Sequence, residues 1–359
     1  MLELGFIQSQ FDPCLYFNED LFVIFYVDDA GIAARTETIA KRFVKDMEDK
    51  GFEITPQGSF TEYLGIKYSR SDDGNVTLTQ PFLIQKIIKA TGLEDANPNW
   101  TPASAEALGK DPDGEPMSES WNYRSIVGML LYLTTNTRPD VAFSVSQVAR
   151  FSHDPKQSHA TAVKKIVRYL LRTQNEGTSI TPSKDLCLDN FVDADFAGLY
   201  GRDPPEDRSS AISRTGYIIK LSNMPLVWKS QLQSGVTLST MEAEYGALSA
   251  SMRVLIPLRQ MLLEFIRHVR IPKTFESVQN KITTTVHEDN NGALALATKH
   301  QVTNRTKHYN IKWHFFWDEV AKGNIEIVRV PTQDQCADYL TKGLVRDVFE
   351  RCRALNQGW

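Results

Sequence analysis

The chain has 359 residues, a formal net charge of −4 and 42% hydrophobic residues. This length suits two or three domains, and so mild a charge excludes a polycation, so any contact with nucleic acid must come from local patches. Four scattered cysteines argue against a zinc site or a disulfide framework, and no signal peptide or membrane-length apolar run is found, so a soluble, intracellular protein is expected.

The first strong pattern is Leu21–Val27, an apolar, aromatic and β-branched run typical of a buried strand. Asp28 and Asp29 follow it, and Ala30–Ala34 reads as a second strand, so the two acids are expected at the tip of a hairpin. An Asp-rich turn is common. The alternative is that two adjacent carboxylates on a rigid hairpin hold Mg²⁺ for phosphoryl transfer.

Further elements follow up to a long linker. A helix over Thr36–Lys50 is expected to stop at Gly51. The patterns then predict strands at 52–55, 63–69 and 76–79, a turn at 72–74, a helix at 81–90, and a Pro- and Gly-rich linker over 97–116.

Three helices are predicted next, over 123–133, 141–151 and 158–173. The third has an apolar stripe and an opposite face that carries Lys164, Lys165, Arg168 and Arg172. Such a face is either simply solvated or lies along a phosphate backbone, and the spacing alone leaves both interpretations open.

The remaining chain alternates strands and helices. Strands are predicted at 186–192, 215–221, 226–229, 282–286 and 325–330, and helices at 241–268, 292–298, 307–322 and 335–341. Ser239 and Thr240 cap the long helix, which Pro257 should kink or split.

Acidic residues recur at the edges of these elements. Asp193 and Asp195 end the first strand, Glu244 lies near the start of the long helix, Asp289 follows a strand, and Asp338 lies on the last short helix. Each could be benign, as a solvated turn or a helix cap. If a fold brings four of them together, their repulsion is costly, and two Mg²⁺ ions about 4 Å apart would offset it and support hydrolysis of a phosphodiester.

In this order, these motifs closely resemble the carboxyl-terminal part of copia-type long-terminal-repeat retrotransposon polyproteins. Phe11–Tyr16 with Phe25–Asp29 is similar to the reverse-transcriptase palm, as are Tyr63–Ile66 and Leu78–Gln80 to its following strands. Three stretches are similar to the family's connecting helical region: 123–128, 131–133 and 137–140. Seven stretches are similar to its ribonuclease H domain: 193–198, 215–217, 228–230, 238–245, 289–290, 305–308 and 337–342.

The resemblance implies a role for each matching acid. Asp193, Glu244, Asp289 and Asp338 correspond to the four metal-binding carboxylates of ribonuclease H, and Asp28 and Asp29 to two of three polymerase carboxylates. Asp195 and Glu242 are the acids nearest to these positions, and the resemblance implies that they either support the metal ligands from outside or are structural. Arg305 and His308, on a basic segment, are expected either to contact the RNA–DNA hybrid or assist product release, or to have only a buried or solvated role.

The chain also departs from the family. The third polymerase carboxylate belongs upstream of Asp28, and no protease or integrase segment is present, so an incomplete polymerase module is expected, from a truncated element or a partial gene model. Pro257 stands where the family usually has a large aromatic residue.

The resulting expectation is an α/β (α+β) chain: a ribonuclease H-like mixed sheet with flanking helices over 183–359, preceded by a partial palm over 1–96 and a linker with thumb-like connecting helices over 97–182. The implied activity is Mg²⁺- or Mn²⁺-dependent hydrolysis of the RNA strand of RNA–DNA hybrids. The rivals are an inactive relic that binds nucleic acid and a DNA-cutting nuclease. Other Gag and Pol products are expected as partners, in a cytoplasmic virus-like particle or in the nucleus.

Overall fold

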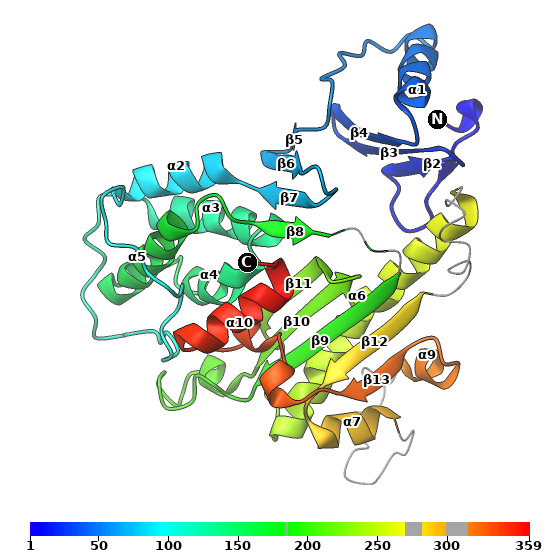
Figure 1. Cartoon of the computed structure of the whole chain (residues 1–359). Coiled ribbons are helices and arrows are strands. Elements are labelled where there is room, and N and C mark those ends of the chain that lie inside the picture. Colours follow the sequence, from blue (N-terminus) through cyan, green and yellow to red (C-terminus); the bar gives the residue numbers. More distant parts are fainter. Residues whose placement is uncertain (182, 184–185, 270–281, 299–314) are drawn as a thin grey trace.

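A computed structural model of the chain describes residues 1–181, 183, 186–269, 282–298 and 315–359. Three β-sheets organise it, as Figure 1 shows. Within the described residues, no helix combines the length and apolar character needed to cross a lipid bilayer.

The first sheet is antiparallel throughout. Its strands, in spatial order, are β1 (Ile7–Gln8), β2 (Leu15–Phe17), β3 (Leu21–Tyr26) and β4 (Asp29–Ala34). Helix α1 (Glu37–Asp49) begins where the Thr36 side chain accepts a hydrogen bond from the Ile39 amide, and it ends before Gly51, as predicted. The helix packs Phe43 and Met47 against Leu21 and Val23.

Strand β3 is only half buried, which corrects the expectation of a fully buried run. Leu21 and Val23 face the core, whereas Ile24 is 41% and Tyr26 57% exposed. The alternation follows because side chains on a strand point to opposite faces in turn, and α1 covers only one of them.

The second sheet joins distant parts of the chain. Its order is β5 (Glu62–Tyr63), β6 (Ile66–Arg70), β7 (Val76–Thr79) and β8 (Thr178–Ile180). The strand expected over 63–69 is split by a turn at Leu64 and Gly65, which both have positive φ. Residues 52–55 form no strand, contrary to prediction, because the chain there finds no pairing partner among the described strands.

Helices form the layer between the second and third sheets (Figure 1). They are α2 (Pro81–Thr91), α3 (Tyr123–Asn136), α4 (Ala142–Ala149), α5 (Gln157–Arg172) and α10 (Arg346–Gln357). Their apolar residues share one core, which includes Ile84, Leu130 and Phe349. The linker predicted over 97–116 contains no helix or strand.

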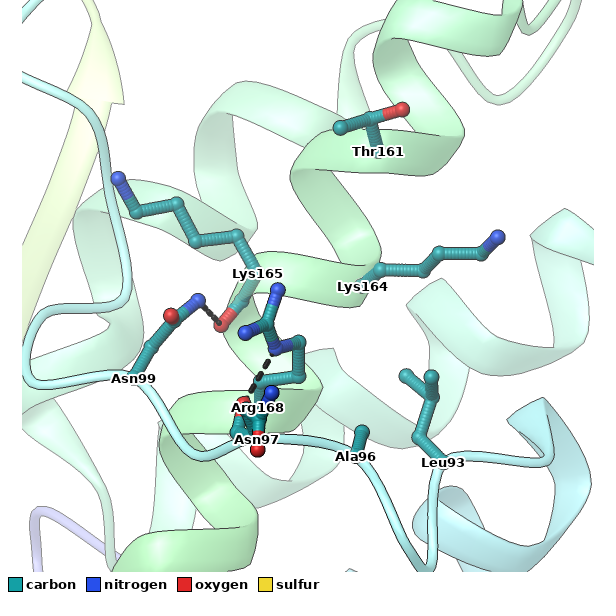
Figure 2. Close-up of a pocket in the computed structure, with 8 residues that line it drawn as sticks. All are labelled: Leu93, Ala96, Asn97, Asn99, Thr161, Lys164, Lys165 and Arg168. Atoms are coloured by element: carbon teal, nitrogen blue, oxygen red, sulfur yellow. Dashed lines mark hydrogen bonds between the residues drawn. The ribbon is translucent and has the colours of Figure 1, made fainter.

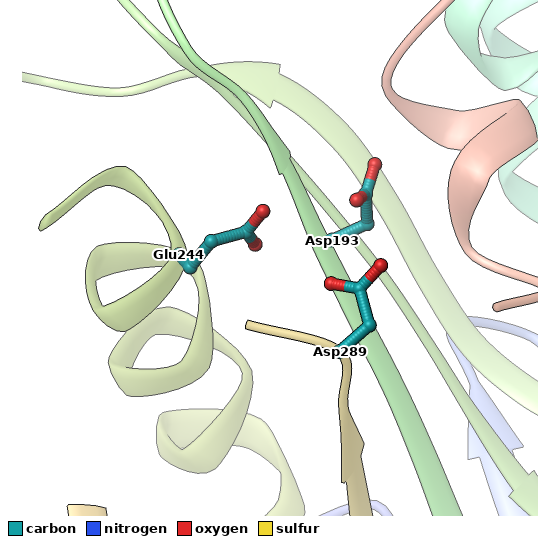
Figure 3. Close-up of side chains that lie close together, drawn as sticks. All are labelled: Asp193, Glu244 and Asp289. Atoms are coloured by element: carbon teal, nitrogen blue, oxygen red, sulfur yellow. The ribbon is translucent and has the colours of Figure 1, made fainter. Parts of the chain in front are cut away.

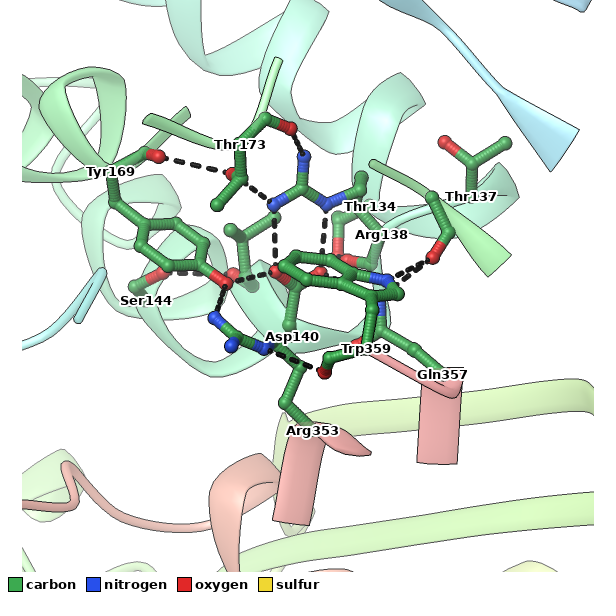
Figure 4. Close-up of polar contacts among 12 residues, drawn as sticks. Thr134, Thr137, Arg138, Asp140, Ser144, Tyr169, Thr173, Arg353, Gln357 and Trp359 are labelled. Atoms are coloured by element: carbon green, nitrogen blue, oxygen red, sulfur yellow. Dashed lines mark hydrogen bonds and ion pairs between the residues drawn. The ribbon is translucent and has the colours of Figure 1, made fainter. Parts of the chain in front are cut away.

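A buried polar network ties the end of the described chain to these helices (Figure 4). Arg138 forms an ion pair with Asp140 at 2.7 Å and donates to the Thr173 carbonyl at 2.9 Å. The Tyr169 hydroxyl and the Gln357 amide both donate to Asp140. The network therefore joins α5 and α10 to the turn between α3 and α4 through one fully buried ion pair.

The third sheet is mixed. In spatial order its strands are β11 (Met224–Leu232), β10 (Arg214–Leu221), β9 (Cys187–Asp195), β12 (Thr283–Glu288) and β13 (Glu326–Arg329). Strands β9, β12 and β13 run parallel, while β10 and β11 are antiparallel to their neighbours. One face packs on α6 (Thr240–His268) and α7 (Asn291–Thr298), and the other on α4 and α10. The predicted mixed sheet with flanking helices is confirmed.

Three local expectations in this region need correction or limits. Helix α6 runs without a break through Pro257, because packing of Leu248, Met252 and Leu255 outweighs the local cost of about 3 kcal/mol. The short helix expected over 335–341 is a 3₁₀ turn, η7 (Asp338–Leu340). Of the helix expected over 307–322, only α9 (Trp317–Ala321) is described, since 299–314 lie outside the described residues.

The first sheet contacts the end of α6. The Ser9 hydroxyl donates to Glu264 at 2.7 Å, and Phe265 packs edge-on against Phe17 and Phe22. The hairpin of β3 and β4 is thus attached to the third sheet through the carboxyl-terminal turns of α6, at the other end of the helix from Glu244.

Candidate metal centre

Strand β9 supplies the central acid. Asp193 lies near the carboxyl end of β9, directly opposite Gly216 of β10. Its side chain is 2% exposed. Gly216 allows the chain after β13 to pack directly on β10. A Cβ at this position would lie 2.5 Å from Thr341 Cγ2 and 2.9 Å from Leu340 Cβ.

Helix α6 supplies Glu244. The Ser239 hydroxyl accepts from the Glu242 amide at 3.2 Å, and the Glu242 carboxylate accepts from the Leu238 amide at 2.6 Å. The Ser239 side chain thus caps the helix, and Glu242 bonds back to the residue before the cap. Glu242 is therefore engaged at the cap, and Glu244 is the acid that meets β9 (Figure 3).

Asp289 follows directly after β12. Its alternative role as a helix cap is taken by Asn290, whose side-chain oxygen accepts from the amides of Gly292 at 2.9 Å and Ala293 at 3.0 Å. The carboxylate of Asp289 instead joins those of Asp193 and Glu244, with ligand atoms all within 4.8 Å of one another (Figure 3).

Asp338 lies beside this group and is linked to it by a lysine. Lys342 Nζ lies 3.0 Å from Asp338 Oδ1 and 3.7 Å from Asp193 Oδ2. The Thr341 hydroxyl donates to Asp193 Oδ2. Three of the four expected acids thus form one tight cluster, and the fourth contacts it through Lys342.

Burial and mutual repulsion raise the pKa of these acids. Burial, followed by the charges of Asp193, Glu288 and Asp289, raises the pKa of Glu244 to about 11. Burial, followed by the charge of Asp193, raises the pKa of Asp338 to about 6. Burial also raises the pKa of Asp193, although Lys342 opposes the shift. A free carboxylate is therefore costly here without a cation.

Sequence reasoning missed several residues that shape the centre. Glu288 is fully buried, its Oε1 accepts from the Asn290 amide at 3.0 Å, and burial raises its pKa to about 8. Thr341, Lys342 and Gly216 lie within the family-like motifs, but the sequence alone assigns them no contact with Asp193. The spacing of four between Asp338 and Lys342 is the one signal that could have identified the lysine as a partner.

The donor set fits a hard divalent cation. Carboxylate oxygens are preferred by Mg²⁺ and Mn²⁺. Among the described residues, Glu244 Oε2 and Glu288 Oε2 are buried without a hydrogen-bond donor. Such orphaned oxygens are expensive unless a cation contacts them, so the cluster of Asp193, Glu244 and Asp289 can hold one.

The other predicted residues lie elsewhere. Asp28 is in the tight turn between β3 and β4, Asp29 begins β4, and both are exposed and outside the acidic cluster. Val27, just before them, has φ +53°, a strained conformation for a β-branched residue. Arg305 and His308 lie outside the described residues.

Lys164, Lys165 and Arg168 of α5 line an open pocket of ≈ 580 Å³ together with the chain after α2 (Figure 2). Lys165 donates to Ser104 at 3.1 Å, and Arg168 donates to the Asn97 carbonyl at 2.5 Å. Lys164 forms an ion pair with Glu119. Arg172 stacks on Trp100, outside the pocket. Lys165, Arg168 and Arg172 thus hold the linker to α5, whereas Lys164 pairs with a residue beyond it.

Comparison with known proteins adds a family context. Residues 1–105 match the family model described as reverse transcriptase (RNA-dependent DNA polymerase). Over 98% of its length the chain is 31% identical to the retrovirus-related Pol polyprotein from transposon RE1 of Arabidopsis thaliana, and 30% identical to that from transposon TNT 1-94 of Nicotiana tabacum. It spans 23% and 26% of these relatives, about a quarter of each.

Among solved structures, the chain superposes on LC11-RNase H1 in complex with an RNA/DNA hybrid with a TM-score of 0.27 and 16% identity. The superposition covers 43% of this chain and 93% of that one. Similarity at this level adds nothing to what strand order and the acidic cluster establish.

Proposed function

Because the chain belongs to the Pol polyproteins of copia-type retrotransposons, we propose that its acidic centre hydrolyses the RNA strand of RNA–DNA hybrids with Mg²⁺ or Mn²⁺. The observation that carries this proposal is the approach of Asp193, Glu244 and Asp289 within 4.8 Å, from three separate elements. Carboxylates at such a distance repel one another, and nothing in the packing of the sheet requires them there.

Each residue has a definite part in this proposal. A bound divalent ion would activate water and stabilise the charge that develops on the scissile phosphate. Asp193, Glu244 and Asp289 hold the ion, with Glu244 presented from near the start of α6. The Thr341 hydroxyl holds Asp193 in place. Asp338 is the fourth acid of the centre, and Lys342 links its carboxylate to that of Asp193.

The substrate would be recognised by shape. Hybrids are distinguished from DNA duplexes by groove shape and 2′-hydroxyls rather than by sequence. We assign phosphate contacts to Lys164, Lys165 and Arg168 around the α5 pocket and to Arg172 beside it, and further contacts to Arg305 and His308. Within the same proposal, Asp28 and Asp29 are two polymerase carboxylates on the β3–β4 hairpin.

The proposal also covers the domain boundaries of the chain, its protein partners and its location in the cell. It divides the chain into a palm portion over 1–96, a connecting region over 97–182 and a nuclease domain over 183–359. Other Gag and Pol products would be partners, in a cytoplasmic virus-like particle or in the nucleus. An inactive relic is disfavoured, because random loss of acids would not spare a buried cluster whose members repel one another.

A panel of labelled substrates tests the activity. The full chain should cut the RNA strand of a hybrid in Mg²⁺ and leave a DNA duplex and an RNA duplex of the same sequence intact. EDTA should abolish the cleavage. Cleavage of the DNA duplex would favour the DNA-cutting nuclease, and no cleavage of any substrate by folded protein would favour the relic.

A further inference from the structure

Gln233, which follows the end of β11, bonds the third sheet to the start of α6. Its side-chain nitrogen donates to the Ala243 carbonyl of α6 at 2.9 Å and to the Thr215 hydroxyl of β10 at 3.1 Å. A carbonyl oxygen only accepts hydrogen bonds, so the NH₂ end of the Gln233 amide must face the helix. One side chain therefore connects the strand beside β9 with the first turns of α6.

Both bonds of this amide end beside an acid of the centre. Ala243 directly precedes Glu244, so the bond to its carbonyl fixes how the start of α6 is turned. Thr215 lies next to the residue that faces Asp193 across the sheet. Gln233 thus links the backbone that carries Glu244 with the strand that pairs with Asp193.

The surroundings hold Gln233 in this position. Its backbone amide donates to the Ser213 carbonyl at 2.8 Å. Thr215 is buried, so the hydroxyl that accepts from Gln233 does not face water. Gly246 lies almost one turn after Ala243, and a Cβ there would lie 3.4 Å from Gln233 Nε2, so the amide rests directly on the helix. The orientation of the Gln233 side chain is therefore set by the chain itself.

We propose that Gln233 is a positioning residue of the metal centre. By holding the Ala243 carbonyl to β10, it keeps the Glu244 carboxylate where it can share a divalent ion with Asp193. This inference rests on the proposed function, and it names a residue that acts on the ion only through Glu244. Replacing residues that orient metal ligands typically lowers metal affinity by about 10- to 100-fold.

Calorimetric titration of the full chain with Mn²⁺, without nucleic acid, tests the proposal. Gln233→Met keeps the length of the side chain and removes its N–H donors. Its affinity for Mn²⁺ should fall about tenfold, at the lower end of the usual range for such residues. Gln231→Met is the matched control, because Gln231 lies on β11 and is exposed, and its affinity should equal that of the parent.

Thr215→Val is a second variant, which keeps the shape of the side chain and removes the hydroxyl. Gln233 can still reach the helix in this variant, so the affinity should fall by only about threefold, as expected for the loss of one hydrogen bond. The double variant should bind Mn²⁺ no more weakly than Gln233→Met alone, because both changes act through the same amide. If Gln233→Met does not fold, unchanged affinity in Thr215→Val overturns the proposal by itself.

Two further measurements separate positioning from a purely structural role. At low Mn²⁺, Gln233→Met should cleave the hybrid more slowly than the parent, and saturating Mn²⁺ should restore the rate of the parent, since Gln233 only orients Glu244. Urea unfolding in EDTA reports the stability of the ion-free chain. A variant that loses stability there and keeps the Mn²⁺ affinity of the parent would overturn the proposal.

The titration also separates this inference from the proposed activity. Equal Mn²⁺ affinity in the parent and in folded Gln233→Met keeps the metal centre and removes the role of Gln233. A lower affinity in Gln233→Met keeps that role even when the parent cuts no hybrid. A parent that binds no Mn²⁺ contradicts the metal centre, and with it both proposals.

Discussion

At the residue scale, Gly216 shows how an absent side chain shapes the centre. It pairs with Asp193 across the sheet, and Thr341 and Leu340 pack into the space that a Cβ would occupy. Contacts of 2.5 Å and 2.9 Å cannot be kept, so any larger residue must push η7 away from β9.

Gly216→Ala is therefore expected to cost about 1–3 kcal/mol of stability through overpacking. It should also weaken Mn²⁺ binding, since the Thr341 hydroxyl would no longer hold the Asp193 carboxylate as it does. Urea unfolding and calorimetry measure the two effects. Gly128→Ala in α3 is the control, because nothing lies within 4 Å of its added Cβ. Equal stability of Gly216→Ala and the parent would contradict the packing described for η7.

The acids of the centre could be named from the sequence, because each stands at the edge of a strong pattern and within a family motif. Lys342 and Thr341 could not be assigned roles in the same way, since their contacts with Asp193 depend on how η7 passes over Gly216. Glu288 was missed because a strand that opens with three consecutive threonines gives no sign of which face is buried.

At the element scale, the buried ion pair of Arg138 and Asp140 holds the connecting helices to α10 (Figure 4). Both side chains are fully buried, and Tyr169, Thr173 and Gln357 satisfy their remaining bonding groups. Removing one member of such a pair leaves the other charge buried without a partner.

Arg138→Met should accordingly destabilise the chain by about 3–5 kcal/mol in urea unfolding. Arg35→Met is the matched control, because Arg35 pairs with Asp20 at 3.2 Å on the surface, where such pairs contribute about 1 kcal/mol or less. A cost for Arg138→Met as small as that of the control would show that the network adds little to stability.

The basic face of α5 belongs to the same scale. If Lys165 and Arg168 bind phosphates, Lys165→Gln with Arg168→Gln should weaken hybrid binding and flatten its dependence on salt. Each lost contact lowers the slope of log affinity against log salt by roughly 0.7–0.9. Lys41→Gln with Arg42→Gln on exposed α1 provides the comparison. An unchanged slope would leave these side chains with the single role of holding the linker.

Helices and strands whose apolar residues recur with a clear period were predicted well. Elements that depend on contacts between residues far apart in the sequence were not. Helices α1 to α5 and strands β9 to β12 follow their apolar patterns. Strand β8 has three residues and exists because it pairs with β7, about a hundred residues earlier in the chain. Helix α10 was not predicted, because its buried residues include the polar Asn356 and Gln357, whose bonding partners lie on other elements.

At the scale of the whole molecule, the raised pKa values make stability depend on pH. Glu288 has a pKa of about 8 in the folded chain against 4.5 for a free side chain, and Asp338 about 6 against 3.8. A raised pKa means that the folded state holds the proton more tightly, so the stabilisation is present at low pH and is lost as pH rises through the folded value.

In EDTA, the free energy of unfolding should therefore fall between pH 5 and pH 8, by at most about 1.4 kcal/mol per pH unit for each proton involved. Mg²⁺ should reduce this fall and stabilise the chain more at pH 8 than at pH 5, because protons compete with the ion for the carboxylates. Urea unfolding at both pH values, with and without Mg²⁺, measures the difference. The same fall with and without Mg²⁺ would show that the acids do not bind it.

The most direct test of the central claim is single-turnover cleavage of a hybrid labelled on its RNA strand, by the parent and by Asp289→Asn. The exchange keeps the shape of the side chain and removes one charge from the cluster, while the cap of α7 is made by Asn290 and survives. The account predicts Mg²⁺-dependent cleavage by the parent, a loss of orders of magnitude in Asp289→Asn, and no loss of stability in that variant. Cleavage at equal rates by the parent and by folded Asp289→Asn would contradict it.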